Sequence, residues 1–371
     1  MKKLLFSIIA VCCANVSYSQ LDNVIFKDTT FYPSQVLNGS YLGMELSPFF
    51  KNNEYFHASQ DGQTYIGYQL QGIFLKKLGE KTMISLGGLA LQNYGNHQGF
   101  TRVVPVVSLN YYEKKSVFIA GTLKGAAHHN LIEPLYAQER FYTDRNENGF
   151  QWLYNGLKTN VDFWLNWEIN TDRSIDRQEQ FSSGLHVKKI FQVGLRHSFT
   201  PSVQMLYQHR GPSNGSSIEP LKTITNGALG LGYSFVKSKF SFSTKSYLLY
   251  YQDFSITKTN SFRDGYGQYH HLQISPNNSM DFILNYCNGT EYQAAKGGPI
   301  YQSVNPFDRR YPERKKQLIF VRFHYHFMLD KNFMLDARLE PYYDINQKLI
   351  EPSYAFNLRY SFISKIQRIK K

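Results

Sequence analysis

Residues 353–362, SYAFNLRYSF, alternate large apolar side chains with polar or small ones at every position. The apolar set begins at Tyr354 and ends at Phe362, whereas the intervening positions include Asn357 and Arg359. Successive side chains of a β-strand point to opposite faces, so the segment predicts a strand with one apolar and one polar face.

The same alternation recurs along the chain and predicts about sixteen strands, each near the length that crosses a bilayer. Their expected ranges are Tyr41–Phe50, Thr64–Lys76, Thr82–Tyr94, Thr101–Tyr112, Ser116–Lys124, Asn148–Asn155, Thr159–Ile169, Glu179–Lys189, Ser202–Arg210, Thr225–Val236, Lys239–Phe254, Gly265–Ser275, Ser279–Cys287, Lys316–Met328, Asn332–Tyr343 and Ser353–Phe362. Asn148–Asn155 has the weakest pattern and rests mainly on the hairpin signal Asn155-Gly156. Fourteen strands therefore remain an alternative.

The N-terminus predicts export. Lys2 and Lys3 precede an apolar run, and small residues at Ser17 and Ser19 fit a signal peptide spanning residues 1–19. Residues 20–371 show no repeat or linker and are expected to form one domain. They contain no apolar run near the ~18 residues that a membrane-spanning helix needs. The sequence thus predicts an all-β protein, an antiparallel up-and-down transmembrane barrel in the cell outer membrane.

Connection lengths support this topology. Short turns are expected at 78–81, 113–115, 155–156, 237–238, 276–278 and 330–331, with longer connections between them. Bacterial barrels alternate short periplasmic turns with long external loops in this way. One junction, 190–201, is too long for a periplasmic turn and breaks the rule.

Charged residues on the predicted strands must face the lumen, because an ionisable group facing lipid costs several kcal/mol near the midplane. The resulting candidates for a selectivity or binding surface are Arg322, His324, His326, Asp336, Arg338, Glu340 and Arg359. A basic surplus is expected inside the barrel from Arg102, Lys158, Lys188, Lys239 and Lys245. Sixteen strands enclose a lumen too wide to be filled by wall side chains alone, which favours a water-filled interior that loops can occlude.

Two metal patterns are weak. His324 and His326 share a face at a feasible ligand spacing, but the sequence names no third ligand, so no metal is expected there. Asp144, Asn146 and Asn148 match the first half of a calcium loop, yet Asn155 stands where a bidentate Glu is needed. A polar loop tip is the favoured interpretation, and no cofactor is expected.

A third pattern concerns catalysis. Outer-membrane lipid hydrolases carry a His-x-Ser-Asn motif in which His activates Ser. Here Ser213 follows His209 by four residues, with Gly211 and Pro212 between them. This partial resemblance implies a lipid hydrolase only as a distant alternative, and the chain is not expected to be an enzyme.

The signal, the alternating strands and the aromatic final strand resemble Gram-negative outer-membrane barrels. The segments LNWE (165–168), RQEQF (177–181) and LYQHRG (206–211) resemble uncharacterised barrels of Bacteroidota. The resemblance implies a porin-like channel or solute-uptake protein, with a structural or assembly barrel of an envelope complex as the alternative. The net charge of +13 fits contact with lipopolysaccharide phosphates or anionic solutes, with an envelope protein as a possible partner. An exported chain excludes nucleic acid as a partner.

Overall fold

The computed structural model describes residues 24–26, 33–57, 61–96, 99–170, 178–212, 220–305 and 312–366. The predicted signal peptide and Ser213 lie outside these residues. The strand segments are β1 (Ser40–Asn53), β2 (Gln63–Lys77), β3 (Thr82–Asn93), β4 (Arg102–Glu113), β5 (Ser116–Thr122), β6 (Asn148–Asn155), β7 (Thr159–Ile169), β8 (Gln178–Lys189), β9 (Phe191–Val193), β10 (His197–Pro212), β11 (Lys222–Lys237), β12 (Phe240–Asp253), β13 (Asp264–Asn277), β14 (Met280–Thr290), β15 (Lys315–Asp330), β16 (Phe333–Leu339), β17 (Tyr342–Asp344), β18 (Leu349–Glu351) and β19 (Ser353–Lys365). Short helical turns are η1 (Val24–Phe26), α2 (Ala126–His129), α3 (Arg140–Thr143) and η2 (Pro299–Tyr301).

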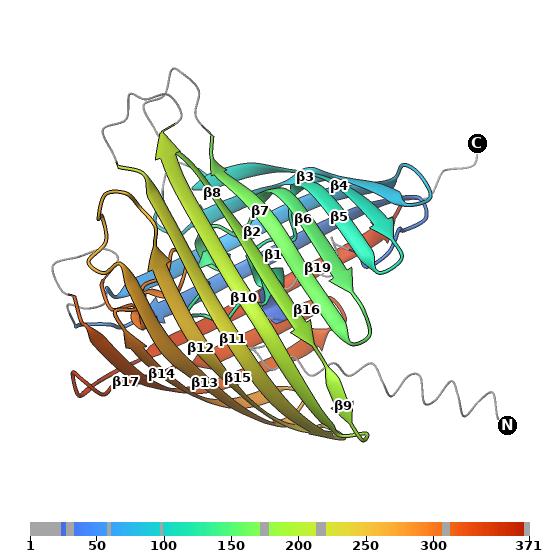
Figure 1. Ribbon diagram of the computed structural model, residues 1–371. Coiled ribbons are helices and arrows are strands. Elements are labelled where there is room, and N and C mark those ends of the chain that lie inside the picture. The colour runs from blue at the N-terminus through green and yellow to red at the C-terminus, as the bar shows by residue number, and fades with distance from the viewer. Residues whose placement is uncertain are drawn as a thin grey trace, which may run out of the picture.

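In the described residues these segments form sixteen wall strands of one closed antiparallel barrel (Figure 1). β9 continues β8, β17 continues β16, and β18 leads into β19. Pro341 and Pro352 mark two of these interruptions, because proline has no N–H to donate to a ladder. β1 pairs with β2 on one side and with β19 on the other, so the sheet closes on itself without a free edge.

The predicted strand count and the predicted class are therefore confirmed. The irregular junction at 190–201 was a misinterpretation, because β9 pairs with β10 and extends the wall beyond β8. The remaining turn is short and contains Gly194 with φ +65°, a conformation that glycine adopts without strain. Short and long connections then alternate around the barrel, which gives it a short-turn end and a long-loop end.

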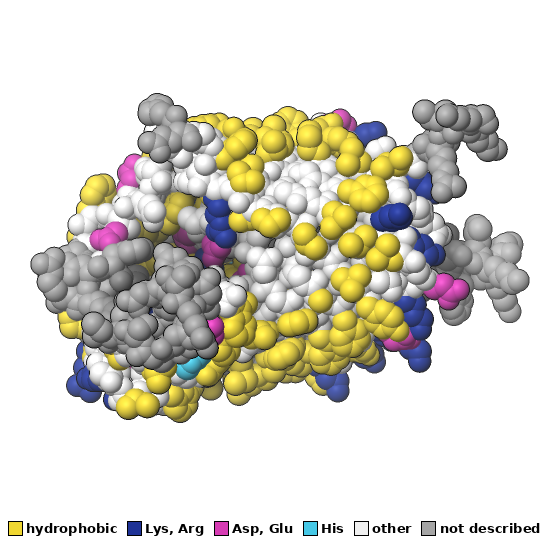
Figure 2. Space-filling model, turned by 90° about the horizontal axis from the view of Figure 1, so that it is seen from above, with side chains coloured by type: hydrophobic (Ala, Val, Ile, Leu, Met, Phe, Trp, Pro, Cys, Tyr) yellow, Lys and Arg dark blue, Asp and Glu magenta, His cyan; other side chains and the backbone are white. Residues whose placement is uncertain are grey.

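The wall has an apolar outer face. Val103, Leu229 and Leu248 are each more than half exposed, and each alternates with inward residues on its strand. Figure 2 shows this apolar surface over the wall, with lysine and arginine side chains gathered toward one end. On the final strand Phe356 and Tyr360 are exposed while Ala355 and Asn357 are buried, as the alternation predicts. None of the helices in the described ranges has the length and apolar character to cross a membrane.

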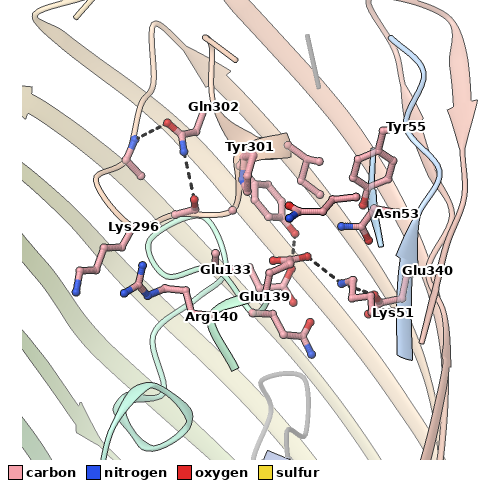
Figure 3. A pocket seen from close by; sticks show the side chains of 18 of the residues that line it. Lys51, Asn53, Tyr55, Glu133, Glu139, Arg140, Lys296, Tyr301, Gln302 and Glu340 are labelled. Carbon is pink, nitrogen blue, oxygen red and sulfur yellow. Dashed lines mark hydrogen bonds and ion pairs between the residues drawn. The ribbon is translucent and has the colours of Figure 1, made fainter. Parts of the chain in front are cut away.

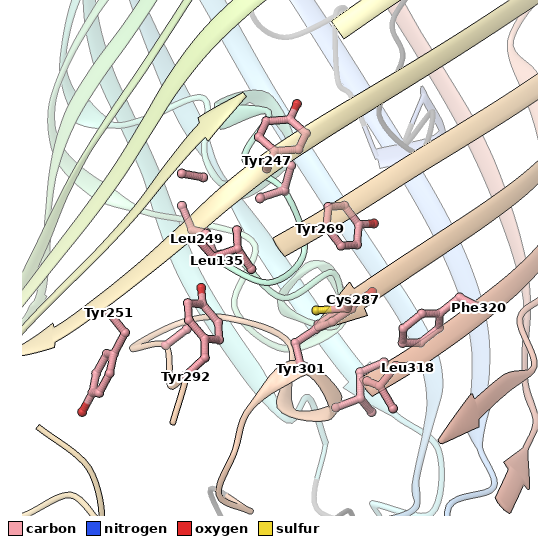
Figure 4. Close-up of a cluster of buried hydrophobic side chains, with 14 of the residues drawn as sticks. Leu135, Tyr247, Leu249, Tyr251, Tyr269, Cys287, Tyr292, Tyr301, Leu318 and Phe320 are labelled. Carbon is pink, nitrogen blue, oxygen red and sulfur yellow. The ribbon is translucent and has the colours of Figure 1, made fainter. Parts of the chain in front are cut away.

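Two long connections fold back into the lumen. We call residues 123–147 the first inward segment and residues 291–305 the second inward segment. Ile132 and Leu135 of the first pack with Tyr292 and Tyr301 of the second. Figure 4 shows how wall side chains of β12 to β15 complete this buried cluster, among them Tyr247, Leu249, Tyr269, Cys287, Leu318 and Phe320.

Candidate functional site

A buried ionic network fixes the start of the first inward segment. Helix α2 follows Gly125, whose φ is +74°, and is capped after its last residue by Asn130 in the left-handed region. That last residue is His129. Its Nε2 lies 2.6 Å from Glu147 Oε2, and its Nδ1 lies 2.8 Å from Asp162 Oδ2 on β7. Both carboxylates can only accept hydrogen bonds, so both ring nitrogens carry protons and His129 is charged.

The electrostatics agree with this protonation. Burial lowers the pKa of His129, but the charges of Glu147 and Asp162 outweigh burial and raise the pKa to about 9. The ring also stacks on Trp164 of β7, with centroids 3.6 Å apart. Gly184 on β8 makes room for that indole, because a Cβ there would lie 2.1 Å from the Trp164 ring. The first inward segment is thus held to β7 by charge and by stacking.

Further contacts tie the same segment to other parts of the wall. Gln69 of β2 donates to the carbonyl of Phe141 at 2.7 Å, and Tyr142 donates to Asn357 of β19 at 3.2 Å. On the opposite side, the Ile132 amide donates to Gln204 Oε1 of β10 at 2.9 Å. Contacts with β2, β7, β10 and β19 place the segment across the lumen.

The second inward segment closes the remaining side. Asn226 of β11 donates to the carbonyl of Gln293 at 2.7 Å and accepts from the Ala295 amide at 3.0 Å. Lys296 forms a buried ion pair with Glu168. The Ala137 amide donates to the Lys296 carbonyl at 2.7 Å, so backbone hydrogen bonding joins the two segments directly. The two inward segments therefore fill the middle of the lumen. The sequence had favoured a water-filled interior there.

A cavity of about 390 Å³ lies between the inward segments and the wall. Its centre is a chain of charges that Figure 3 displays. Lys51 Nζ of β1 lies 2.9 Å from Glu139 Oε1 and 3.2 Å from Glu340 Oε2. Arg322 of β15 binds Glu133 through two parallel hydrogen bonds of 2.7 and 2.6 Å. We call this space the chamber.

The Glu139 carboxylate is held ionised by Lys51. Burial raises the pKa of Glu139, but the Lys51 ammonium outweighs burial and keeps this pKa below its ordinary value. Tyr301 Oη donates to Glu133 Oε2 at 2.5 Å, the same oxygen that accepts from Arg322 Nη2. Glu139 has a side chain that is one-fifth exposed, more than those of Lys51 and Glu340. Among the carboxylates of Glu133, Glu139 and Glu340, that of Glu139 is the one that a ligand reaches most easily.

The seven selectivity candidates predicted from sequence all lie on the inner face, in two groups. Arg322 and Glu340 line the chamber. Closer to the short-turn end, Arg338 and Asp336 form an ion pair of 2.7 Å, and His324 hydrogen bonds to Asp336. The two less buried members lie at the edges of this second group: His326 is beside His324, and Arg359 donates to the carbonyl of Ile25 at 2.9 Å.

The predicted calcium loop and two of the lysines predicted inside the barrel do not contribute to a lumen site. Asp144 binds Arg102 and Arg140 at 2.9 and 2.6 Å, while Asn148 accepts from Thr122, so these two oxygens have other partners. Lys158 and Lys239 are exposed in short turns and add nothing to the lumen charge. The predicted strand at Lys239 began one residue before β12 does, whereas Lys158 lies in the turn before β7, whose bounds were predicted correctly.

Of the proposed hydrolase pair, the structure describes only His209. His209 alternates with Gln208 and Arg210 and shares the outer face of Val203 and Met205, and its Nδ1 lies 2.9 Å from Thr223 Oγ1. Ser213 lies outside the described residues, so the geometry of the pair is not defined.

Sequence reasoning missed the residues of the inward segments. His129, Glu133 and Glu139 lie in a connection, where no periodicity marks which side chains turn inward. Lys51 was missed for a simpler reason, because the first strand runs three residues beyond its expected end at Phe50. Its inward position follows from the alternation once that end is corrected.

The chain matches the family model described as lipid A 3'-O-deacylase-type over residues 37–369, which is nearly all of the barrel. The chain belongs to this family. A search of curated proteins returns no match. Membership in this family favours a lipid hydrolase more strongly than the spacing of His209 and Ser213 does.

Solved structures with the same fold are outer-membrane proteins. OmpT of Vibrio cholerae, as a loop L8 deletion mutant, superposes with a TM-score of 0.52 at 9% identity, over 87% of this chain and 99% of that one. OprD of Pseudomonas aeruginosa gives a TM-score of 0.52 at 10% identity, over 89% of this chain and 95% of that one. At these identities the likeness concerns the fold, which is that of an outer-membrane β-barrel.

Proposed function

We propose that this protein resides in the outer membrane and hydrolyses an acyl ester of lipid A or a closely related glycolipid, with the chamber as the site for the polar part of the lipid. Family membership over almost the whole barrel supports the substrate class. The chamber is the observation that carries the proposal, because it brings cations and an accessible carboxylate together inside the barrel. Its volume lies in the range of small-molecule sites.

The chamber charges suit ester hydrolysis. Glu139 orients a water molecule and takes a proton from it as the water oxygen attacks the ester carbonyl. Lys51 and Arg322 stabilise the negative charge that develops on the carbonyl oxygen. The bond from acyl carbon to sugar oxygen then breaks, the sugar oxygen takes the proton from Glu139, and a fatty acid leaves. The same cations attract the phosphate groups of the lipid.

This function is tested with purified protein and lipid A in mixed micelles. Mass spectrometry should show lipid A that has lost one acyl chain. Glu139→Gln should lower the rate by about 100-fold, a typical loss when a general base is removed. Glu113→Gln is the matched control, because Glu113 also pairs with a lysine, Lys81, but at an exposed short turn. Lipid A that stays intact with folded wild-type protein would sink the proposal.

A channel for small anionic solutes is the second candidate. The observation in its favour is that Lys188 and Lys245 lie on inward-facing strand positions, near the buried His186 and His271. Such a channel requires the inward segments to move. Swelling of liposomes in sugar phosphates but not in neutral sugars of equal size would support it. Equal swelling in both kinds of sugar, or no swelling in either, would contradict an anion-selective channel.

A structural role in an envelope complex needs no hydrolysis and no conduction. It would appear as a stable partner that copurifies in mild detergent while the lipid A assay stays silent. Lipopolysaccharide itself is the expected partner under the leading proposal.

A further inference from the structure

A second cluster of potential ligands lies in the lumen near the short-turn end, away from the chamber. It consists of Asp281 on β14 and of His324 and His326 on β15. Asp281 pairs directly with His324 in the strand register, and the two histidines occupy successive inward positions of the same strand. One potential ligand atom from each residue lies within 4.8 Å of those of the other two.

The hydrogen bonds around His324 define how its ring is oriented. Nε2 is bound to the carboxylate of Asp336, which can only accept, so Nε2 carries a proton. Asp336 is itself fixed by Arg338 at 2.7 Å and by Asn357 at 3.0 Å. A carboxylate that holds the far nitrogen of a histidine is the usual second-shell partner of a metal-binding imidazole.

On the other side of the ring, His324 Nδ1 lies 3.1 Å from Asp281 Oδ2. Without a metal ion a proton on Nδ1 bridges this contact, as at His129, and a bound metal ion would replace that proton. His326 Nδ1 also lies 3.7 Å from the same oxygen. One metal ion at this point would contact all three groups.

Hydrogen bonds orient the Asp281 carboxylate toward the two histidines. Its Oδ1 accepts from Ser275 Oγ at 2.5 Å and from Gln273 Nε2 at 2.9 Å, which orients Oδ2 toward the histidines. In a tetrahedral zinc site, bonds of ~2.0–2.1 Å put ligand atoms about 3.3 Å apart. The distances from Asp281 Oδ2 to His324 and His326, 3.1 and 3.7 Å, bracket this value, and the two histidine ligand atoms lie within 4.8 Å of each other.

We propose that Asp281, His324 and His326 bind a divalent transition-metal ion of the Zn²⁺ type, with water in the fourth position. Two imidazoles and one carboxylate favour such ions over Ca²⁺ or Mg²⁺, which prefer oxygen ligands. His326 is the most accessible of the three, with a side chain 14% exposed, and gives the ion a route from the lumen. The site is independent of the hydrolysis proposed for the chamber.

The test uses the full-length barrel without a polyhistidine tag, stripped with chelator and titrated with Zn²⁺ against a chromophoric competitor. One ion per chain is expected at pH 7.5, with binding lost near pH 5 as imidazole protonates. Co²⁺ should give a visible absorption band that Zn²⁺ abolishes.

His326→Gln should weaken Zn²⁺ binding by at least tenfold, in the range seen when a site loses one of its supporting groups. His270→Gln is the matched control, because His270 lies on the outer face of β13 beside Ser246 and away from the cluster. It should bind Zn²⁺ as the wild type does. Asp281→Asn gives a second variant that keeps side-chain shape. Absence of stoichiometric binding, or wild-type affinity in His326→Gln with the barrel folded, would overturn the proposal.

Discussion

The two halves of the lumen are stabilised in different ways. Toward the long-loop end, ion pairs join an inward segment to the wall, as in His129 with Asp162 and Glu133 with Arg322. Toward the short-turn end, charges such as Asp336 with Arg338 join wall residues to each other. The first kind of contact decides whether the lumen is filled, and the second strengthens the barrel itself. Mutations in the two halves should therefore separate filling of the lumen from stability of the wall.

The largest effect is expected from His129→Leu. Removal of the imidazolium takes away the cation between Glu147 and Asp162 and leaves Glu147 with Lys296, at 4.0 Å, as its ion-pair partner among the described residues, which costs about 3–5 kcal/mol. The cost falls on the first inward segment, because the wall ladders do not depend on it. Trypsin should then cleave after Arg140, while unheated samples still migrate on gels as a folded barrel. Protection equal to that of the wild type would show that the segment is held by other contacts.

A rise in pH should loosen the same segment. The folded pKa of His129 is about 9, above its ordinary value of 6.5, so its stabilisation is complete below about pH 6.5 and is lost as pH rises through about 9. A shift of this size corresponds to roughly 3 kcal/mol. Hydrogen exchange of residues 123–147, corrected for intrinsic rates, should accelerate between pH 7 and pH 10. In His129→Leu the acceleration should vanish.

A substitution in the other half should spare the inward segments. Asp336→Asn removes the charge that faces Arg338 and His324, and it should destabilise the wall by about 2 kcal/mol, because Arg338 keeps some attraction to Glu340. The urea midpoint in detergent should fall, while trypsin protection of Arg140 persists. Cleavage at Arg140 in folded Asp336→Asn would contradict the division between the two halves.

The smallest effect is expected at the exposed turn pair Lys81 and Glu113. Lys81→Met should leave stability almost unchanged, since exposed ion pairs contribute little. Neither the urea midpoint nor trypsin protection should change measurably. A shift as large as that of Asp336→Asn would mean that the urea midpoint does not report buried pairing.

The sequence predicted the wall well because alternation carries the information. Phe356 and Arg359 were assigned to their faces from a period of two, and the same rule placed Arg322 and His324 in the lumen. The inward segments follow no such rule, so Glu133 and Glu139 could not be distinguished from residues of a solvated loop. The third ligand beside His324 also required the register of β14 against β15, which a shift of one residue would have changed.

Deletion of residues 126–146 tests the central claim, that the inward segments close the lumen, most directly. In planar bilayers the wild-type protein should remain closed, whereas the deletion variant should give large, stable conductance steps of an open sixteen-strand barrel. Wild-type steps as large as those of the deletion variant would contradict the account.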